Sequence, residues 1–408
     1  MDFHSIESMK ILHINAVLDI GSTGTITRDI HELCISKGIS SKIVYAIGPE
    51  RDTDLYRMGN IIDHKLHALL SRFSENQASF SNIPTRNLIK EIEKYHPDWV
   101  HFHNVHANFI HVYKVLDYLS NKGIGVVITL HDCWFFTGGC THFTSFKCDR
   151  WKINCGECPR MNSFGERPSI FDGTARNRKN KFDALSKLQN LYLVGVSNWV
   201  VNQSKLFGLT NAKYATIYNG IDFEIFKPTE SDLRKQLNID GKFILLGPSD
   251  KWKSAHNIEN LKLLASKIDE DCVIVLFGGR EKDSTLPDNI IEYSYTRDKQ
   301  QLAQLYSMSD VFINSTHEDT LSLINIEAQA CGTPVITYRN TGAQETVDEV
   351  SSISVPDDDI DVLLFKIKEM KQNTKSSYSK ECINWVRSRF DINENYQKYI
   401  ELYKSRVK

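Results

Sequence analysis

The sequence of 408 residues contains no long hydrophobic run. No stretch approaches the roughly 18 to 20 consecutive apolar residues that a membrane-spanning helix needs. Residues 1–19, MDFHSIESMKILHINAVLD, lack a charged segment followed by an apolar one, and His13 and Asn15 interrupt their only apolar run. The pattern predicts neither a signal peptide nor a membrane span, so we expect a cytoplasmic protein.

The chain also has little excess charge, because 49 lysines and arginines stand against 51 aspartates and glutamates, for a net charge of −2. Chains that bind nucleic acid usually carry a pronounced basic excess, so we expect no nucleic acid among the partners. Nine cysteines in a chain without a signal peptide indicate thiols or metal ligands rather than a disulfide framework.

Short apolar runs alternate with helical patterns along the whole chain, which is typical of parallel α/β units. Examples are MKILHINAV and SKIVYAI in the first half, and KFILLGPSD and CVIVLFGG in the second. The length exceeds that of one typical core, and the polar segment DFEIFKPTESD separates the halves. We therefore predict two Rossmann-like domains with parallel sheets facing across a cleft, residues 1–222 and 223–388. Residues 389–408 are expected to form a C-terminal helix that packs back on the first domain.

Polar residues follow several of the predicted strands, and ligands of open parallel sheets bind at the carboxyl ends of the strands. The apolar segment GVVITLHDCW ends in His131 and Asp132, which places the His131 imidazole at a strand tip. His103 and His106 follow another apolar segment, but the spacing of these histidines is not that of a metal site. A histidine bonded to the local backbone is the alternative interpretation of His131.

Two loops after predicted strands are candidates for binding phosphate. Residues Gly21 to Gly24 open a helix at a point where the backbone can approach a bound group, although the G-x-G-x-x-G fingerprint of a dinucleotide site is absent. In the second half, the loop GPSDKWKSAHN carries Lys251, Lys253 and His256 beside a helix start, where an anion is favoured. A common tight turn and a solvated charged loop are the respective alternatives.

The segment HEDTLSLINIEAQACGTPVI, residues 317–336, predicts a helix from about 321 to 331. Asp319 or Thr320 can cap its start, because a short polar side chain accepts a free backbone N–H there. Gly332 and the proline that follows end it, because glycine adopts the left-handed conformation and proline cannot continue a helix.

Within this predicted helix, one carboxylate lies among apolar residues. Three polar residues recur at intervals of three and four, and we expect them on the solvated side: Ser322, Asn325 and Gln329. Glu327 falls on roughly the opposite side, where a carboxylate is costly without a hydrogen-bonding partner. We therefore predict that Glu327 points to a partner outside its own helix. A structural ion pair or backbone contact is the alternative to a ligand.

Four cysteines follow the His131 segment with the spacing C-x7-C-x6-C-x2-C, within the predicted loop 133–160: Cys140, Cys148, Cys155 and Cys158. Four thiolates can hold a tetrahedral Zn²⁺ that orders a long loop, so a structural zinc site is one interpretation. Reduced packing thiols or a disulfide are the alternatives. Four thiolate ligands leave no open position, so this zinc would not be catalytic.

The helical segment GTARNRKNKFDALSKLQN is rich in basic residues: Arg176, Arg178, Lys179 and Lys181. Such a helix can lie on an anionic bilayer. A solvated basic face is the alternative.

Several segments together carry a resemblance to a known family. GVSNWVVNQ, IYNGIDFEIFKP, LAQLYSMSDVFINSTHEDTLSLINIEAQACGTPVIT and NTGAQETV resemble the retaining glycosyltransferases of family 4, over nearly the whole chain and most densely from 301 to 347. TLHDCWFFTGGC and the cysteines after it resemble the subgroup that builds bacterial surface polysaccharides. The resemblance implies the two-domain GT-B fold and a nucleotide-diphosphate sugar as donor, most simply a UDP- or GDP-sugar.

The resemblance also implies roles for individual residues. Glu327 matches the second acid of the family's E-x7-E motif, which binds the nucleotide ribose, and Asp319 takes the place of the first acid, which contacts the donor sugar. Backbone N–H groups around Leu321 and Ser322 match those that face the diphosphate. His131 matches the strand-end histidine near the transferred sugar. Apart from the resemblance, the place of Gly24 in the loop after the first strand makes it a candidate for close approach to the ligand.

Two positions depart from the family pattern. The first acid is aspartate rather than glutamate, and the family's diphosphate-binding Arg…Lys pair does not align cleanly, because the lysine position falls on His256. We expect Lys251 and Lys253 with helix N-termini to stabilise the leaving diphosphate without a metal ion. The acidic run Asp357–Asp359 resembles the metal-binding motif of the other glycosyltransferase fold, but it precedes a helix, so capping explains it better.

These observations predict a metal-independent retaining hexosyltransferase that needs no cofactor. It would move a sugar from a nucleotide sugar to a lipid-linked oligosaccharide, for O-antigen, lipopolysaccharide or capsule, as a peripheral protein on the inner face of the cell membrane. Retention without an obvious carboxylate nucleophile suggests front-face attack. The alternatives are a nucleotide-sugar epimerase or hydrolase on the same fold, and a non-catalytic partner subunit, against which Asp319 and Glu327 speak.

Overall fold

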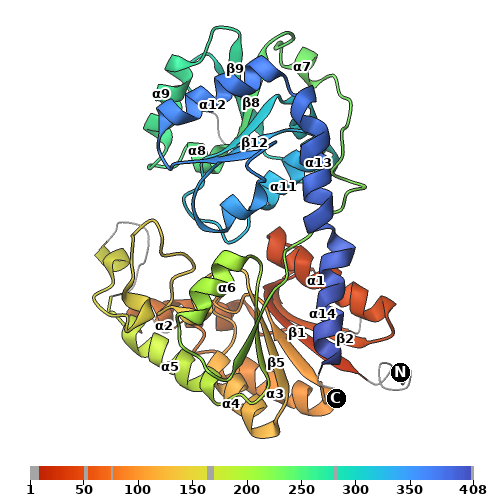
Figure 1. Ribbon diagram of the computed structural model, residues 1–408. Helices are drawn as coiled ribbons and strands as arrows, with labels where there is room; N and C mark the ends of the chain where they lie inside the picture. The colour runs from red at the N-terminus through yellow and green to blue at the C-terminus, as the bar shows by residue number, and fades with distance from the viewer. Residues whose placement is uncertain (1–8, 50–53, 75–76, 163–169, 280–282, 406–408) are drawn as a thin grey trace. The chain divides into compact units, whose positions relative to one another are not determined.

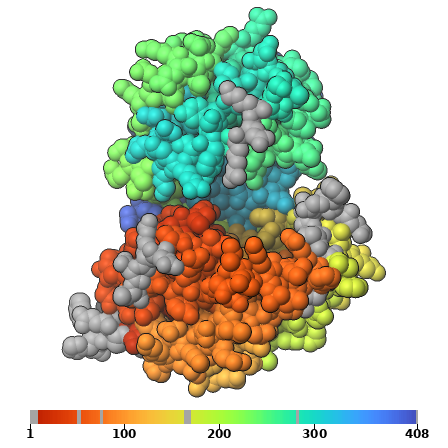
Figure 2. All heavy atoms as spheres, turned by 180° about the vertical axis from the view of Figure 1, so that it is seen from behind, coloured from red at the N-terminus to blue at the C-terminus, as the bar shows by residue number. Residues whose placement is uncertain are grey.

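The computed structural model describes the residues shown in colour in Figure 2, namely 9–49, 54–74, 77–162, 170–279 and 283–405. The chain divides into two compact units. Unit 1 consists of Met1–Ile217 with Tyr396–Lys408, and unit 2 of Tyr218–Asn395.

Unit 1 is built on a seven-stranded parallel sheet with the order β3-β2-β1-β4-β5-β6-β7. The strands are β1 Lys10–Val17, β2 Ser40–Ile47, β3 Leu55–Arg57, β4 Trp99–Phe102, β5 Gly125–Leu130, β6 Leu191–Gly195 and β7 Ala212–Thr216. The central strands β4 and β5 are buried along their whole length, as continuous apolar segments of a parallel sheet require. The carboxyl ends of β1, β4 and β5 therefore lie side by side.

Helices connect these strands (Figure 1): α1 Gly21–Ser36, α2 Ile61–Ser74, α3 Asn82–Tyr95, α4 Val112–Lys122, α5 Thr174–Ser186 and α6 Asn198–Lys205. Between β5 and α5 the helical elements of the described residues are short 3-10 turns, η2 Trp134–Phe136, η3 Arg150–Lys152 and η4 Pro159–Asn162. Aromatic rings order this loop: Trp151 packs with ring centroids 5.2 Å from Phe136 and 4.8 Å from Phe143.

The end of the chain packs on the sheet of unit 1. The last helix, α14 Ile392–Lys404, brings buried tyrosines to β4 and β5. Trp99 Nε1 donates a 2.9 Å hydrogen bond to Tyr403 O, and the hydroxyls of Thr129 and Tyr399 are 2.9 Å apart. These bonds satisfy polar groups that the packing removes from water.

Unit 2 is built on a six-stranded parallel sheet with the order β10-β9-β8-β11-β12-β13. Its strands are β8 Phe243–Pro248, β9 Cys272–Gly279, β10 Ile290–Ser294, β11 Val311–Asn314, β12 Val335–Tyr338 and β13 Ile353–Val355. Its helices are α7 Leu233–Gln236, α8 Ser249–Trp252, α9 Ile258–Lys267, α10 Lys299–Met308, α11 Leu323–Ala330, α12 Ile360–Asn373 and α13 Ser376–Phe390, with a 3-10 segment η5 Thr341–Thr346. Apolar residues of the strands, such as Ile274 and Ile313, form one core with Leu261 of α9 and Leu363 of α12. The predicted fold class, two parallel α/β sheets, is confirmed.

Candidate functional site

Glu327 of α11 has a partner on α10. The Tyr306 hydroxyl donates a 2.9 Å hydrogen bond to Glu327 Oε2; Tyr306 is fully buried and Glu327 half-buried. Burial raises the pKa of Glu327 to about 7, although the bond from Tyr306 and the charge of Lys299 oppose this. The prediction that Glu327 points to a partner outside its own helix is confirmed.

The polar stripe of the same helix is buried, so the prediction of a solvated side was wrong. Asn325 Nδ2 donates to Thr346 Oγ1 (2.9 Å) and Gln329 Nε2 to Thr346 O (2.7 Å). Asn314 Nδ2 of β11 donates to Ser322 Oγ (2.8 Å) and to Asn325 Oδ1 (2.9 Å). Helical periodicity identifies a polar side but does not tell whether water or another element of the fold supplies its partners.

The helix α11 begins two residues later than expected, with Ser322 rather than Asp319 or Thr320 as its N-cap. The Ser322 side chain makes no capping bond, so it does not satisfy the first N–H groups of the helix, which favour an anion. Asp319 lies just before, where its Oδ1 accepts the Leu321 N–H at 3.2 Å and its N–H donates to Thr341 Oγ1 at 3.2 Å. Asp319 and the helix start thus lie at the carboxyl end of β11.

The two lysines predicted to bind phosphate differ in their surroundings. Lys253 Nζ lies 2.7 Å from Glu292 Oε1 of β10, and both side chains are largely buried. Lys251 Nζ lies 3.6 Å from Asp250 Oδ2 and is more exposed, and exposed pairs of this kind are weak. Lys251 is therefore the lysine of this loop that can most readily turn toward a diphosphate.

In unit 1, His131 follows β5 directly, which confirms its predicted place at a strand tip. It ends a chain of imidazoles: His131 Nε2 lies 3.1 Å from His103 Nδ1, and His103 Nε2 lies 3.3 Å from His13 Nδ1. Burial holds the pKa of His13 and His103 well below the usual value and lowers that of His131 to about 4. His131 is therefore a neutral imidazole at pH 7.

His101 of β4 and His103, which follows it, are hydrogen-bonded to protein groups. His101 Nδ1 lies 2.6 Å from the Tyr403 hydroxyl, and its Nε2 lies 2.7 Å from Thr129 Oγ1. Ligand atoms of His13, His101 and His103 lie within 4.8 Å of one another, but both ring nitrogens of His101 and of His103 are hydrogen-bonded already. We therefore interpret this cluster as a hydrogen-bonded network rather than a metal site.

His106 and Asp132 form a pair beside this network. His106 Nε2 lies 2.9 Å from Asp132 Oδ2, while Asp132 Oδ1 accepts the Trp134 N–H at 2.8 Å. Burial disfavours the charged carboxylate, but His106 and the Trp134 N–H outweigh it and lower the pKa of Asp132. The pair fixes the turn that follows His131.

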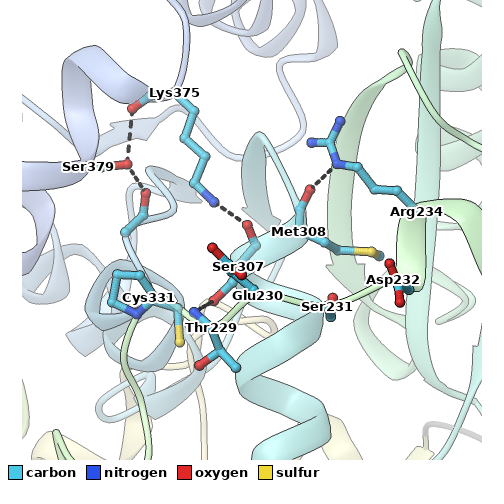
Figure 3. Close-up of a pocket in the computed structure, with 12 residues that line it drawn as sticks. Thr229, Glu230, Ser231, Asp232, Arg234, Ser307, Met308, Cys331, Lys375 and Ser379 are labelled. Carbon is cyan, nitrogen blue, oxygen red and sulfur yellow. Dashed lines mark hydrogen bonds between the residues drawn. The ribbon is translucent and has the colours of Figure 1, made fainter.

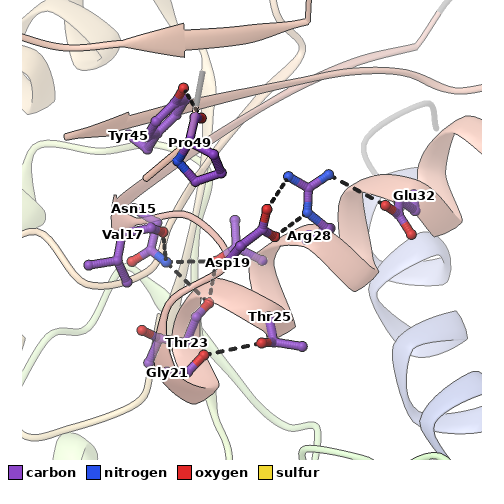
Figure 4. Close-up of polar contacts among 11 residues, drawn as sticks. Asn15, Val17, Asp19, Gly21, Thr23, Thr25, Arg28, Glu32, Tyr45 and Pro49 are labelled. Atoms are coloured by element: carbon purple, nitrogen blue, oxygen red, sulfur yellow. Dashed lines mark hydrogen bonds and ion pairs between the residues drawn. The ribbon is translucent and has the colours of Figure 1, made fainter. Parts of the chain in front are cut away.

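Sequence reasoning missed the role of Asn15, which holds the first loop together (Figure 4). Its Nδ2 donates to Val17 O, Thr23 O and Thr27 Oγ1 at 2.9 to 3.1 Å, and its Oδ1 accepts from the Ala16 and Asn104 N–H groups. The signal was the interruption of an apolar strand by one buried amide. Asn15 thereby sets the path of the chain into α1.

Gly24 lies in the first turn of α1, directly against the preceding backbone. A Cβ at this position would lie 3.0 Å from Asp19 N. Ile20 is the N-cap of α1 and makes no side-chain cap, and the first turn contains no acidic residue. Asp19 instead pairs with Arg28 (Figure 4). The start of α1 is thus a second place where backbone N–H groups can meet an anion.

Of the four cysteines of the β5–α5 loop, Cys140 is buried and the other three are half-buried. The groups of three or more potential metal ligands that lie within 4.8 Å of one another among the described residues include none of these four. Burial raises the pKa of the Cys155 thiol to about 11. The structural zinc site stays a prediction, and aromatic rings pack together among the described residues of the loop.

The basic helix α5 turns part of its charge inward. Lys181 is 2% exposed, donates to Trp134 O and Thr137 O, and lies over the Trp134 ring. Arg178 donates to Trp151 O and Lys152 O. Lys181 is therefore not on a solvated face, and both residues bind backbone carbonyl groups of the β5–α5 loop.

An open pocket of about 860 Å³ in unit 2 contains none of the predicted site residues (Figure 3). Lys375 lines it and donates from Nζ to Ser307 O (2.7 Å) and Ser309 O (2.8 Å), at the end of α10. Burial lowers the pKa of Lys375 to about 8. This lysine caps carbonyl groups at the helix end, so we assign it a structural role.

Comparison with known proteins identifies both units. The family described as "Glycosyltransferase Family 4" matches residues 25–225, and that described as "Glycosyl transferases group 1" matches residues 242–373. A putative colanic acid biosynthesis glycosyl transferase, WcaC of Escherichia coli K12, is 22% identical over 97% of this chain and 100% of its own. The capsular polysaccharide biosynthesis glycosyltransferase CapM of Staphylococcus aureus is 27% identical over 32% of this chain and 37% of its own.

Solved structures share the fold over almost the whole length. Sucrose-phosphate synthase from Thermosynechococcus elongatus superposes with a TM-score of 0.69 at 17% identity, over 98% of this chain and 99% of that one. Anabaena HepE in complex with UDP and glucose superposes with a TM-score of 0.66 at 16% identity, over 97% of this chain and 100% of that one. With the two family matches and two parallel sheets, this chain belongs to the family 4 glycosyltransferases and has the GT-B fold.

Proposed function

We propose that this protein is a retaining hexosyltransferase that moves a sugar from a nucleotide-diphosphate sugar to a lipid-linked oligosaccharide during bacterial surface-polysaccharide synthesis. The observation that carries the proposal is the half-buried carboxylate of Glu327, which lies on α11 just beyond the Asp319 loop and accepts a hydrogen bond from Tyr306 of α10. The names of WcaC and CapM support polysaccharide synthesis, and the HepE complexes with UDP and with UDP-glucose support the class of donor.

In this proposal each unit contributes its own part. In unit 2, Glu327 accepts hydrogen bonds from the ribose hydroxyls and Asp319 contacts the donor sugar. The first N–H groups of α11, near Leu321 and Ser322, and Lys251 stabilise the charge of the leaving diphosphate without a metal ion at the reacting atoms. In unit 1, neutral His131 and the loop at Gly24 border the transferred sugar. We propose front-face attack, which retains the configuration of the sugar.

We further propose that the protein acts at the inner face of the cell membrane, and that α2 makes the contact. This helix exposes an apolar side: Ile61, Ile62, Leu66, Leu69, Leu70 and Phe73. The exposed Ile170 and Phe171 extend it, because their N–H groups donate to Arg72 O and Phe73 O at the end of α2. Lys65 and Arg72 are exposed on the same helix. An apolar side with adjoining basic residues suits an anionic bilayer surface.

Among the described residues, no helix combines the length and apolarity needed to cross a bilayer. The proposal for α2 is therefore one of surface attachment, with the acceptor lipid embedded in the same membrane.

The donor is tested by thermal melting with UDP-glucose, GDP-mannose and ADP-glucose, followed by titration of the nucleotide that raises the melting temperature. We expect one nucleotide to bind, and Glu327→Gln to weaken its binding. Incubation of the bound sugar with lipid-linked oligosaccharide should then give a product with retained anomeric configuration. Donor turnover without acceptor would favour the hydrolase or epimerase, and absence of nucleotide binding would favour the partner subunit.

A further inference from the structure

Three potential metal ligands meet at the carboxyl edge of the sheet of unit 2, each from a different loop. His256 lies between α8 and α9, His317 follows β11, and Asp358 lies between β13 and α12. Each side chain offers one ligand atom, and the three atoms lie within 4.8 Å of one another. Residues more than one hundred positions apart are thus brought together by the topology of the sheet.

Two of the three ligand atoms already face each other. His317 Nε2 lies 3.0 Å from Asp358 Oδ1, at hydrogen-bonding distance, so a small shift of either side chain makes room for an ion between them. The His256 ring stands edge-on to the His317 ring, with centroids 4.9 Å apart. His256 is exposed and His317 half-buried, so an ion can enter from solvent.

Neighbouring polar groups orient the cluster. Asn260 Nδ2 donates a 2.9 Å hydrogen bond to Asp358 Oδ1. Residues that hydrogen-bond to a metal ligand without touching the metal commonly hold the ligand in position. The ring of the buried Tyr338 lies edge-on to that of His317, with the ring centroids 5.1 Å apart.

The two other aspartates of the acidic run have separate roles. Asp359 caps α12 by accepting the Val362 N–H at 3.0 Å, which confirms the capping expected from the sequence. Asp357 accepts from Asn340 Nδ2 at 2.9 Å. Asp358 alone is turned to the histidines, so the ligand set is two imidazoles and one carboxylate.

We propose that His256, His317 and Asp358 form a binding site for a divalent transition-metal ion, for which Zn²⁺ is the best match. Mg²⁺ and Ca²⁺ prefer sets made of oxygen alone, whereas imidazole nitrogens suit Zn²⁺ and its neighbours. Three protein ligands leave a fourth position for water. The ion ties three loops of unit 2 together. Whether this ion binds does not depend on which donor and acceptor the enzyme uses.

This site is tested on the full chain after removal of metal with EDTA and exchange into chelator-free buffer. Zn²⁺ is titrated calorimetrically into wild type, His317→Ala, Asp358→Asn and the control Asp361→Asn, whose carboxylate is exposed on α12 and pairs with Lys267. We expect wild type and the control to bind about one ion more per chain than either site variant. The comparison removes any contribution from the cysteine loop, which is the same in all four proteins.

Thermal melting gives a second readout that does not depend on the calorimetry. Zn²⁺ should raise the melting temperature of wild type and Asp361→Asn more than that of His317→Ala, because an ion bound only by the folded state stabilises it. The metal-free variants should melt close to metal-free wild type, because the ligands lie at or near the surface. Equal Zn²⁺ stoichiometry and equal melting shifts in wild type, His317→Ala and Asp358→Asn would overturn the proposal.

Discussion

The hydroxyl of Tyr306 on α10 donates a 2.9 Å hydrogen bond to Glu327 Oε2 on α11. The donor is fully buried and the acceptor half-buried, so each group depends on the other for its hydrogen bond away from bulk water. One bond from Tyr306 does not compensate for the desolvation of a full charge, and the pKa of Glu327 therefore remains raised, at about 7. Hydroxyl groups of a bound ribose would supply the additional donors.

The first prediction concerns stability and pH in the absence of donor. The folded protein holds the Glu327 proton more tightly than the unfolded chain, whose carboxyl has the ordinary pKa of 4.5. The resulting stabilisation is complete below that pKa and is lost as the pH rises through about 7. The size of the pKa shift sets an upper limit of ~3 kcal/mol on this stabilisation. The true value is smaller, because Glu327 is only half-buried and solvent screens its charge.

Urea unfolding of wild type and Glu327→Gln at a series of pH values from 5 to 8.5 tests this. The difference in unfolding free energy between the two proteins should change in favour of the variant as the pH rises, since glutamine does not ionise. A difference that is constant across this range would show that Glu327 titrates normally.

The second prediction distinguishes the role of Glu327 in nucleotide binding from its role in the stability of the fold. Glu327→Ala should weaken nucleotide binding by about 1.5 to 3 kcal/mol, the range for a hydrogen bond to a charged group. It should also cost ~1 to 3 kcal/mol of stability, because it leaves the buried Tyr306 hydroxyl without its acceptor. This cost follows from the Tyr306 contact, which the sequence does not reveal.

The matched control is the double variant Glu327→Ala with Tyr306→Phe. Removing both partners should recover part of the stability but none of the nucleotide affinity. Nucleotide titrations and urea melts on the three proteins distinguish the effects. If the folded fraction of Glu327→Ala bound nucleotide as wild type does, Glu327 would serve the fold alone.

The sequence predicted features that depend on local pattern. Glu327 was recognisable because its neighbours three and four positions away are apolar, and His131 because an apolar strand ends immediately before it. The burial of Asn325 was not recognisable, because its partners Asn314 and Thr346 come from other elements. Helix periodicity is the same whether a polar side meets water or the protein.

The contacts around His131 likewise depend on elements that are distant in the sequence. His13 and Asn15 interrupt the strand β1, His101 interrupts β4, and His103 follows it at a spacing of two from His101. That these strands are neighbours in the sheet, with β4 between β1 and β5, is a property of the topology. The distance between His103 and His131 therefore could not be derived from the sequence.

The third prediction concerns His131. If its imidazole borders the transferred sugar, His131→Ala should lower kcat strongly while the Kd of the nucleotide changes little. Because burial lowers the pKa of His131 to about 4, the group is neutral from pH 6 to 8, and its protonation should leave no inflection in the wild-type kcat profile over that range. Circular dichroism and melting of the variant check the fold. A folded variant with wild-type kcat would exclude a role in transfer.

The fourth prediction concerns metal ions in catalysis. With Lys251 and the start of α11 stabilising the leaving diphosphate, kcat at saturating donor should be unchanged after brief treatment with EDTA. The measurement is transfer to acceptor before and after chelation. Activity that disappears with EDTA and returns with Mg²⁺ or Mn²⁺ would show that a metal ion acts on the diphosphate itself.

The fifth prediction concerns the membrane surface. The double variant Leu66→Glu with Leu69→Glu places two charges in the apolar side of α2, at side chains that are 55% and 51% exposed. We expect wild type to float with vesicles that contain phosphatidylglycerol, and the double variant to remain in solution, because both apolar contact and attraction to anionic lipid are reduced. Leu206→Glu is the matched control in unit 1, since Leu206 is 50% exposed outside α2.

All three proteins should melt at similar temperatures, because exposed substitutions have small effects on stability. Equal flotation of the double variant and wild type would exclude α2 as the membrane contact, and absence of flotation in all three would exclude attachment to anionic lipid.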